Sequence, residues 1–167
     1  MRLFTALEVP GPVVEALHAW AVEHGSGLRI LPAASLHATL VFLGERPAGE
    51  VERIGAALHE AVAPVGALSL GKPAALGRGS ALSIDLVDGE GAAAGLQERL
   101  ATALGVLERR AYRPHVTVAR GRDVTVRGLP PLPELGTFEG TAATLFRSRP
   151  GSRYEALVSV PLDVGGS

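Results

Sequence analysis

The sequence predicts an α+β fold in which two lobes, each with an antiparallel sheet, frame a central cleft and carry their helices on the outer faces. Three observations favour this fold. Strand-like and helix-like segments alternate along the chain, and no linker is long enough to separate independent domains. The helix-like segments each show one apolar stripe. A His-x-Thr motif occurs once in each half, so we expect one domain over residues 1–167, built from a duplicated unit with two pseudo-symmetric lobes.

The first half predicts two strands and two helices. Residues 2–9 alternate and are rich in strand formers, and residues 12–24 predict a helix that Pro12 opens. Residues 36–44 predict a strand that ends at a glycine. Residues 47–63 predict a second helix, whose apolar stripe should pack on a sheet.

The second half continues the alternation. Three short strands are predicted at residues 66–70, 74–79 and 81–87. A helix follows at 92–104 and a strand at 114–120. Residues 121–133 predict a loop, because they contain glycine and a Pro-Pro pair. Two closing segments predict a hairpin, at residues 141–148 and 153–162.

Composition excludes several classes of protein. The chain has 167 residues and no cysteine, which rules out a disulfide framework, a zinc ribbon and a thiol nucleophile. No apolar run reaches the length of a membrane span, and the first residues lack the pattern of a signal peptide. These features predict a cytoplasmic protein without a membrane partner.

Charge is distributed unevenly along the chain. Residues 1–98 carry six Lys and Arg against eleven Asp and Glu, whereas residues 99–153 carry ten Arg against four acids. The excess of arginine in the second half indicates where an anion would bind, although a solvated arginine-rich face would give the same pattern.

The two His-x-Thr motifs lie in strands, where side chains alternate between faces. His37 and Thr39 should therefore share one face, and His115 and Thr117 should do the same on their own strand. By this alternation Phe42 points away from His37, which predicts that it belongs to the core.

Two imidazoles and two hydroxyls in one cleft suit the cleavage of a phosphodiester. One imidazole can take a proton from the attacking oxygen, the other can protonate the leaving oxygen, and the hydroxyls can bind the phosphate oxygens. Two alternatives stay open: each histidine could be structural, or the pair could bind a metal. The metal site is less favoured because no nearby carboxylate completes a ligand set.

The sequence resembles the 2H phosphoesterases, and among them the bacterial and archaeal RNA 2',3'-cyclic phosphodiesterases, which are also called 2'-5' RNA ligases. Four segments carry the resemblance in order along nearly the whole chain: "RLFTALEVP", "LHATLVFLGE", "YRPHVTVAR" and "TLFRSRPGSRYEAL". The resemblance implies a bilobal fold with an open cleft and no required metal or cofactor.

Roles in the reaction follow from the same resemblance. It implies that His115 is the proton acceptor that activates water, and that His37 is the proton donor to the departing 3' oxygen. Thr39 and Thr117 would hold the phosphate oxygens. Arg120, which matches the arginine that closes the second signature, would neutralise phosphate charge or hold the RNA backbone.

Tyr112 and Phe42 are further candidates, because either ring could stack on a base, although strand alternation favours the core for Phe42. The expected substrate is RNA that ends in a 2',3'-cyclic phosphate, hydrolysed to a 2'-phosphate by a monomer, with 2'-5' ligation as a possible reverse reaction. Two alternatives remain: a non-catalytic RNA-binding or nucleotide-binding module, and a phosphodiesterase of a small cyclic nucleotide.

Overall fold

The structure is a computed structural model, and it describes residues 1–162. Eight strands form one antiparallel sheet: β1 (Arg2–Glu8), β2 (Arg29–Ile30), β3 (Ala38–Glu45), β4 (Leu68–Leu76), β5 (Ala81–Asp88), β6 (His115–Arg120), β7 (Ala142–Arg149) and β8 (Arg153–Pro161). Three α-helices accompany it: α1 (Gly11–His24), α2 (Val51–Ala61) and α3 (Ala92–Ala103). The predicted α+β class is confirmed.

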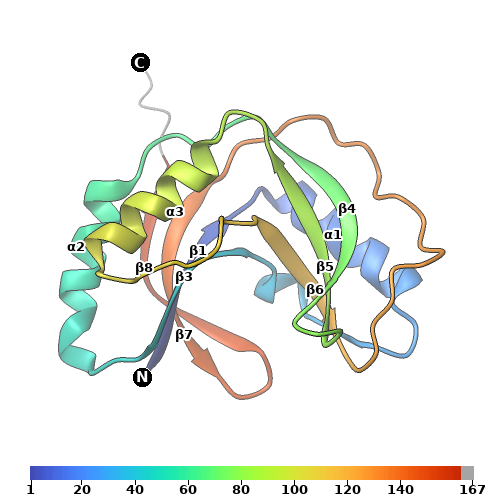
Figure 1. The fold of residues 1–167 in the computed structure, drawn as a ribbon, viewed down its shortest axis with the longest axis horizontal. Helices are drawn as coiled ribbons and strands as arrows, with labels where there is room; N and C mark the ends of the chain where they lie inside the picture. Colours follow the sequence, from blue (N-terminus) through green and yellow to red (C-terminus); the bar gives the residue numbers. More distant parts are fainter. Residues whose placement is uncertain (163–167) are drawn as a thin grey trace.

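The strands follow the order β4-β5-β6-β3-β1-β7-β8, and β2 pairs with β6. The two predicted sheets are therefore joined, and the join is narrow: the residues paired between β3 and β6 are Ala38 and Val116. On either side of this pair the two halves of the sheet diverge (Figure 1). Both His-x-Thr motifs therefore lie where the two halves of the sheet join.

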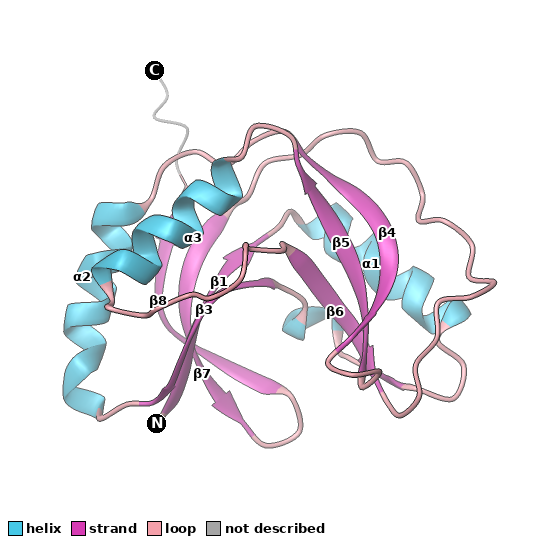
Figure 2. Cartoon of the chain, viewed as in Figure 1, coloured by secondary structure: helices cyan, strands magenta, loops and turns pink. Residues whose placement is uncertain are grey.

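The helices lie on the outer faces, as predicted (Figure 2). Helices α2 and α3 cover the half that contains β3, β7 and β8, and α1 covers the half that contains β6. Their apolar stripes form the core, with Leu17, Leu58, Leu96 and Leu100 completely buried. None of the helices among residues 1–162 has the length and apolar character needed to cross a membrane.

The packing of α1 and α3 is exchanged relative to their order in the chain. Helix α1 comes before β3 in the chain but packs against β6, and α3 comes before β6 but packs against β3. Helix α1, from the first half of the chain, therefore contacts the motif strand of the second half, and α3, from the second half, contacts the motif strand of the first. Helix α3 also contacts β5, the neighbour of β6, and so spans both halves of the sheet.

The prediction of separate strands at 66–70 and 74–79 is wrong. A single strand, β4, runs from Leu68 to Leu76 and has a register shift between Leu70 and Pro73. Proline has no N–H to donate, and it is accommodated here because β4 is an edge strand with a bulge. The strand ends in a turn where Arg78 and its flanking glycines all have positive φ.

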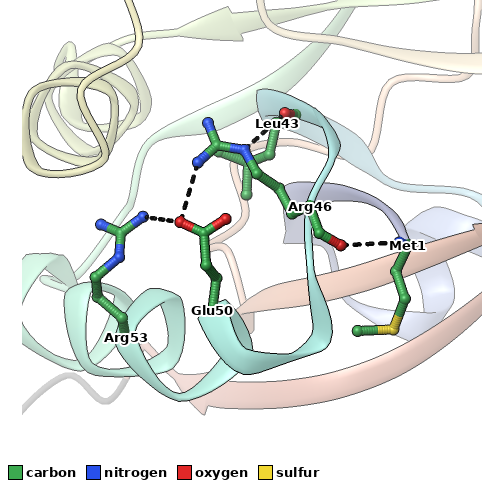
Figure 3. Close-up of polar contacts among 5 residues, drawn as sticks. All are labelled: Met1, Leu43, Arg46, Glu50 and Arg53. Atoms are coloured by element: carbon green, nitrogen blue, oxygen red, sulfur yellow. Dashed lines mark hydrogen bonds and ion pairs between the residues drawn. The ribbon is translucent and has the colours of Figure 1, made fainter.

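A polar network holds the ends of β1 and β3 together (Figure 3). The amino group of Met1 donates to the carbonyl oxygen of Arg46 at 2.8 Å, and Nε of Arg46 donates to the carbonyl oxygen of Leu43 at 3.0 Å. Glu50 pairs with Arg46 at 3.5 Å and with Arg53 at 2.9 Å. The network fixes the turn from β3 to α2.

Candidate active site

The two His-x-Thr motifs meet at the pair that joins the sheet. When the register is continued from Ala38 and Val116 by one residue in each direction, Thr39 lies opposite His115, and the residue before β3, His37, lies opposite Thr117. Ala38 and Val116 are completely buried on one face of the sheet. The two histidines and two threonines are only half-buried on the other face.

Each histidine ring is held by the carbonyl oxygen of the residue two positions before it. Nδ1 of His37 lies 2.8 Å from the carbonyl oxygen of Ser35, and Nδ1 of His115 lies 2.7 Å from that of Arg113. A carbonyl oxygen only accepts hydrogen bonds, so Nδ1 must carry the proton in both rings. This leaves Nε2 of each ring as the nitrogen that can exchange a proton with a substrate.

Aromatic rings surround His37. The ring centroids of Phe4 and Tyr154 each lie 5.0 Å from that of His37, and the centroid of Phe146 lies 5.8 Å away. Tyr154 meets the imidazole edge to face. These rings keep water from much of the His37 side chain.

Burial accordingly changes the acidity of His37. Its pKa is lowered from 6.5 to about 4, chiefly because burial penalises the charged ring. The hydrogen bond to Ser35 opposes this shift, and the charges of Arg120 and His115 add to it. At neutral pH the ring is therefore uncharged in the unliganded protein. An anion bound beside it would favour the protonated form.

A cavity of about 360 Å³ opens beside His37. It is lined by three aromatic side chains and several polar groups. The lining residues are Arg2, Leu3, Phe4, His37, Thr39, Phe42, Gly44, Ser148, Ser152 and Tyr154. We call it the His37 cavity. It lies on the β1, β7 and β8 side of the motif residues, so it could hold a group attached to a phosphate that sits between the two histidines.

The two threonines are oriented differently. Oγ1 of Thr39 lies 3.2 Å from Nε2 of His37. Oγ1 of Thr117 lies 3.0 Å from Oγ of Ser83, a completely buried residue on β5. Each hydroxyl thus has a partner that limits its rotation. Sequence reasoning did not identify Ser83.

Arg120 and Tyr112 occupy different surroundings. Arg120, the last residue of β6, is half-buried, and its charge acts on His37. The hydroxyl of Tyr112 donates to the carbonyl oxygen of Thr39 at 2.8 Å, and its ring packs against the core. Burial raises the pKa of this phenol well above its usual value. The geometry therefore favours a role for Tyr112 in holding β3 over stacking on a base.

The prediction that Phe42 belongs to the core is wrong. Its side chain is 72% exposed and lines the His37 cavity. The register shifts between Thr5 and Ala6 of β1, where β3 has one residue more, so Thr39 and Phe42 share a face although they are three positions apart. Regular alternation cannot predict this reversal, because a bulge leaves no signal in the run Leu40 to Leu43.

Several residues of the site were not identified from the sequence. Arg2, Phe4, Ser148, Ser152 and Tyr154 line the cavity. They come from β1 and the β7–β8 hairpin, which lie far from the motifs in the chain. Strand alternation gives the face of each residue within its own strand, but only the sheet order places β1 beside β3 and the β7–β8 hairpin beyond β1.

Metal-ligating side chains are dispersed over the described part of the chain. Between residues 1 and 162, no three His, Cys, Asp or Glu side chains are grouped closely enough to hold a metal ion. The site therefore offers two imidazoles, two hydroxyls, a guanidinium and an aromatic cavity as its chemical groups.

Comparison with known proteins gives a family and a fold. The sequence model of the 2'-5' RNA ligase superfamily matches residues 9–148. No curated protein matches the sequence. Among solved structures, that of TT0787 from Thermus thermophilus is 28% identical, with a TM-score of 0.74 over 97% of this chain and 98% of that chain.

Two structures of E. coli LigT are also similar. The complex with 3'-AMP is 23% identical and has a TM-score of 0.77 over 96% of this chain and 97% of that chain. The complex with NADP+ is 24% identical and has a TM-score of 0.79 over 96% of each chain. At this level of identity, the likeness to LigT establishes a shared fold.

Proposed function

The chain belongs to the 2'-5' RNA ligase superfamily, and on this premise we propose that it opens 2',3'-cyclic phosphates at RNA ends to give 2'-phosphates. One observation carries the proposal. The two His-x-Thr motifs, 78 positions apart in the chain, meet at the Ala38–Val116 pair with all four polar side chains on one face.

His115 is the proposed proton acceptor. Its Nδ1 is committed to the carbonyl oxygen of Arg113, so the lone pair of Nε2 is available to take a proton from water. The water oxygen then forms a bond to phosphorus, and the bond from phosphorus to the 3' oxygen breaks. General base catalysis of this kind contributes about 10²- to 10⁴-fold to a rate.

His37 is the proposed proton donor to the departing 3' oxygen. The lowered pKa of about 4 means that the free protein holds this ring uncharged at neutral pH. The anionic phosphodiester itself supplies the charge that stabilises the imidazolium, so protonation is coupled to substrate binding. If a 5'-hydroxyl takes the place of the water, His115 would accept its proton, the 5' oxygen would form the bond to phosphorus, and the bond to the 3' oxygen would break, which leaves a 2'-5' link.

The remaining polar groups bind the phosphate. Thr39 and Thr117 donate to the non-bridging oxygens, and their partners His37 and Ser83 restrict the hydroxyls before substrate arrives. Arg120 neutralises part of the charge that develops on the phosphate.

The His37 cavity is the proposed site of the terminal nucleoside. Exposed Phe42 offers an apolar face on which a base can stack, and Tyr154 lines the same cavity. LigT, which shares the fold, was crystallised with 3'-AMP, and this supports a nucleotide ligand for the present chain.

We further propose that the protein acts as a cytoplasmic monomer without metal or cofactor. The symmetric register at the motifs supports our proposal of a single domain with two pseudo-symmetric lobes.

The test uses a short RNA that ends in a 2',3'-cyclic phosphate, incubated with chelator-treated protein. We expect a 2'-phosphate product from the wild type and loss of turnover in both His37→Ala and His115→Ala. His59→Ala, on α2, is the control, because its side chain lies outside the motifs.

Each other result has a definite meaning. A 3'-phosphate product would reverse the leaving oxygen that we assign to His37. Turnover that chelation abolishes and zinc restores would contradict metal independence. Tight RNA binding without turnover would identify the protein as a binding module, and turnover of small cyclic nucleotides alone would remove RNA as the substrate.

A further inference from the structure

The two carbonyl groups that hold the histidines lie outside the sheet. Strand β3 begins at Ala38 and β6 begins at His115, so the carbonyls of Ser35 and Arg113 both come before the first strand residue. Ladder hydrogen bonds therefore do not fix these two peptide groups. The N–H that shares a peptide group with the Ser35 carbonyl donates to the carbonyl oxygen of Ala33 at 3.1 Å, and Pro114 gives the Arg113 peptide group no N–H at all. Contacts of the Ser35 and Arg113 side chains add to this limited support from the backbone.

Ser35 is held by its own side chain. Its hydroxyl donates to the carbonyl oxygen of Ser152 at 3.0 Å, 117 positions away at the tip of the β7–β8 hairpin. Nη1 of Arg29 donates to Oγ of Ser152 at 3.2 Å and so holds the same hairpin tip. Ser152 has a φ of 58°, in the left-handed region that a serine rarely adopts.

Arg113 is also held by its own side chain. Its guanidinium makes a two-pronged contact with Asp85, with Nε to Oδ1 at 2.9 Å and Nη2 to Oδ2 at 3.0 Å. Asp85 lies on β5 as the cross-strand partner of His115. Two parallel bonds fix the direction of the arginine as well as its distance.

We propose that Ser35 and Arg113 are matched positioning residues, each anchoring by its side chain the carbonyl group that orients one histidine. Ser35 is anchored to the β7–β8 hairpin and orients His37. Arg113 is anchored to β5 and orients His115. The inference builds on the proposed function, which gives the two histidines their roles. It adds a serine and an arginine that each orient one histidine, one in each half of the sheet.

The test separates the two anchors through the tautomers of the rings. Imidazole nitrogen-15 spectra distinguish a proton on Nδ1 from one on Nε2, and they need no turnover. In Ser35→Ala we expect the Nε2–H form of His37 to increase while His115 is unchanged. In Arg113→Ala we expect the reverse. Each variant is thus a control for the other.

Activity supplies the second readout. Because a hydrogen bond of this kind contributes modestly, we expect kcat to fall about 3- to 10-fold in each variant, with KM nearly unchanged. Ser35→Thr keeps a hydroxyl and should restore both readouts. Two further variants remove similar contacts elsewhere: Ser80→Ala, whose hydroxyl donates to Gly77, and Arg149→Ala, whose guanidinium binds Glu155. Both should behave as wild type.

The proposal is overturned if Ser35→Ala and Arg113→Ala leave both tautomers unchanged, or if each alters the two rings equally. A fall in activity without a tautomer change would also reject it, since the effect would then not pass through the histidines. If the wild type fails to hydrolyse the cyclic phosphate, the proposed function fails, while the spectra still decide whether the anchors orient the rings.

Discussion

Ala38 and Val116 form the pair that joins the two halves of the sheet, and both side chains are completely buried. Their position decides the geometry of the site. In an antiparallel pair the neighbours of the paired residues point to the opposite face, so this one contact brings His37 to Thr117 and Thr39 to His115. A substitution that separates the two strands would separate the two imidazoles.

Removal of either threonine hydroxyl should reduce catalysis. For Thr39→Val and for Thr117→Val we expect kcat to fall by about 10²- to 10³-fold, because each hydroxyl is proposed to donate to a phosphate oxygen. Valine keeps the branched shape that β-strands favour, so the fold should persist. Steady-state kinetics on the cyclic-phosphate RNA measure this effect. Thr125→Val, in the exposed loop after β6, should retain full activity.

Phe42→Ala should affect binding without affecting stability. The ring is exposed, so we expect the free energy of unfolding to change by less than about 0.5 kcal/mol. Loss of a stacking surface should raise KM about 5- to 100-fold. Urea unfolding and kinetics together measure the two effects. Leu107→Ala, at another exposed apolar residue, should leave KM unchanged. A large loss of stability in Phe42→Ala would mean that the ring is part of the core.

Tyr112→Phe should show the opposite pattern. The change removes the hydroxyl that donates to Thr39 and leaves that carbonyl without its partner, which should reduce the free energy of unfolding by about 1–2 kcal/mol. Because the ring itself remains in place, KM should change little. Unchanged stability in Tyr112→Phe would mean that the phenol does not hold β3 through Thr39.

The acidity of His37 gives a prediction for binding. Proton NMR of the free protein should show a His37 pKa of about 4, and saturating inorganic phosphate should raise it, because the anion stabilises the imidazolium. The resonances of His59 on α2 should not respond to phosphate. An unchanged His37 titration would mean that phosphate does not bind beside this ring.

For turnover we expect a bell-shaped dependence on pH that reports the histidine pair.

The same pKa predicts how stability depends on pH. His37 has a pKa of about 4 when folded and about 6.5 when unfolded, so the unfolded chain binds more protons between these values. The contribution of His37 to stability should therefore decrease as pH falls from about 6.5 to about 4. Urea unfolding of the wild type and of His37→Gln across this range measures it. A difference between the two proteins that does not vary with pH would contradict the assignment.

Much of the fold and the chemical core of the site could be predicted from local sequence. Helical spacing predicts α1, α2 and α3, and strand composition predicts β1, β5, β6 and the β7–β8 hairpin. Alternation also places His37 with Thr39 and His115 with Thr117. These features depend on the periodicity of apolar and polar residues within one element, which can be read from consecutive residues.

Tertiary structure alone decided the rest. The bulge that turns Phe42 toward His37, the buried phenol of Tyr112 and the exchange of α1 and α3 all depend on contacts between distant segments. The sequence by itself determined which groups are available for the chemistry. Only the packing of the strands determined that both motifs share one face, and that burial would lower the pKa of one histidine, because register and desolvation are properties of neighbours in space.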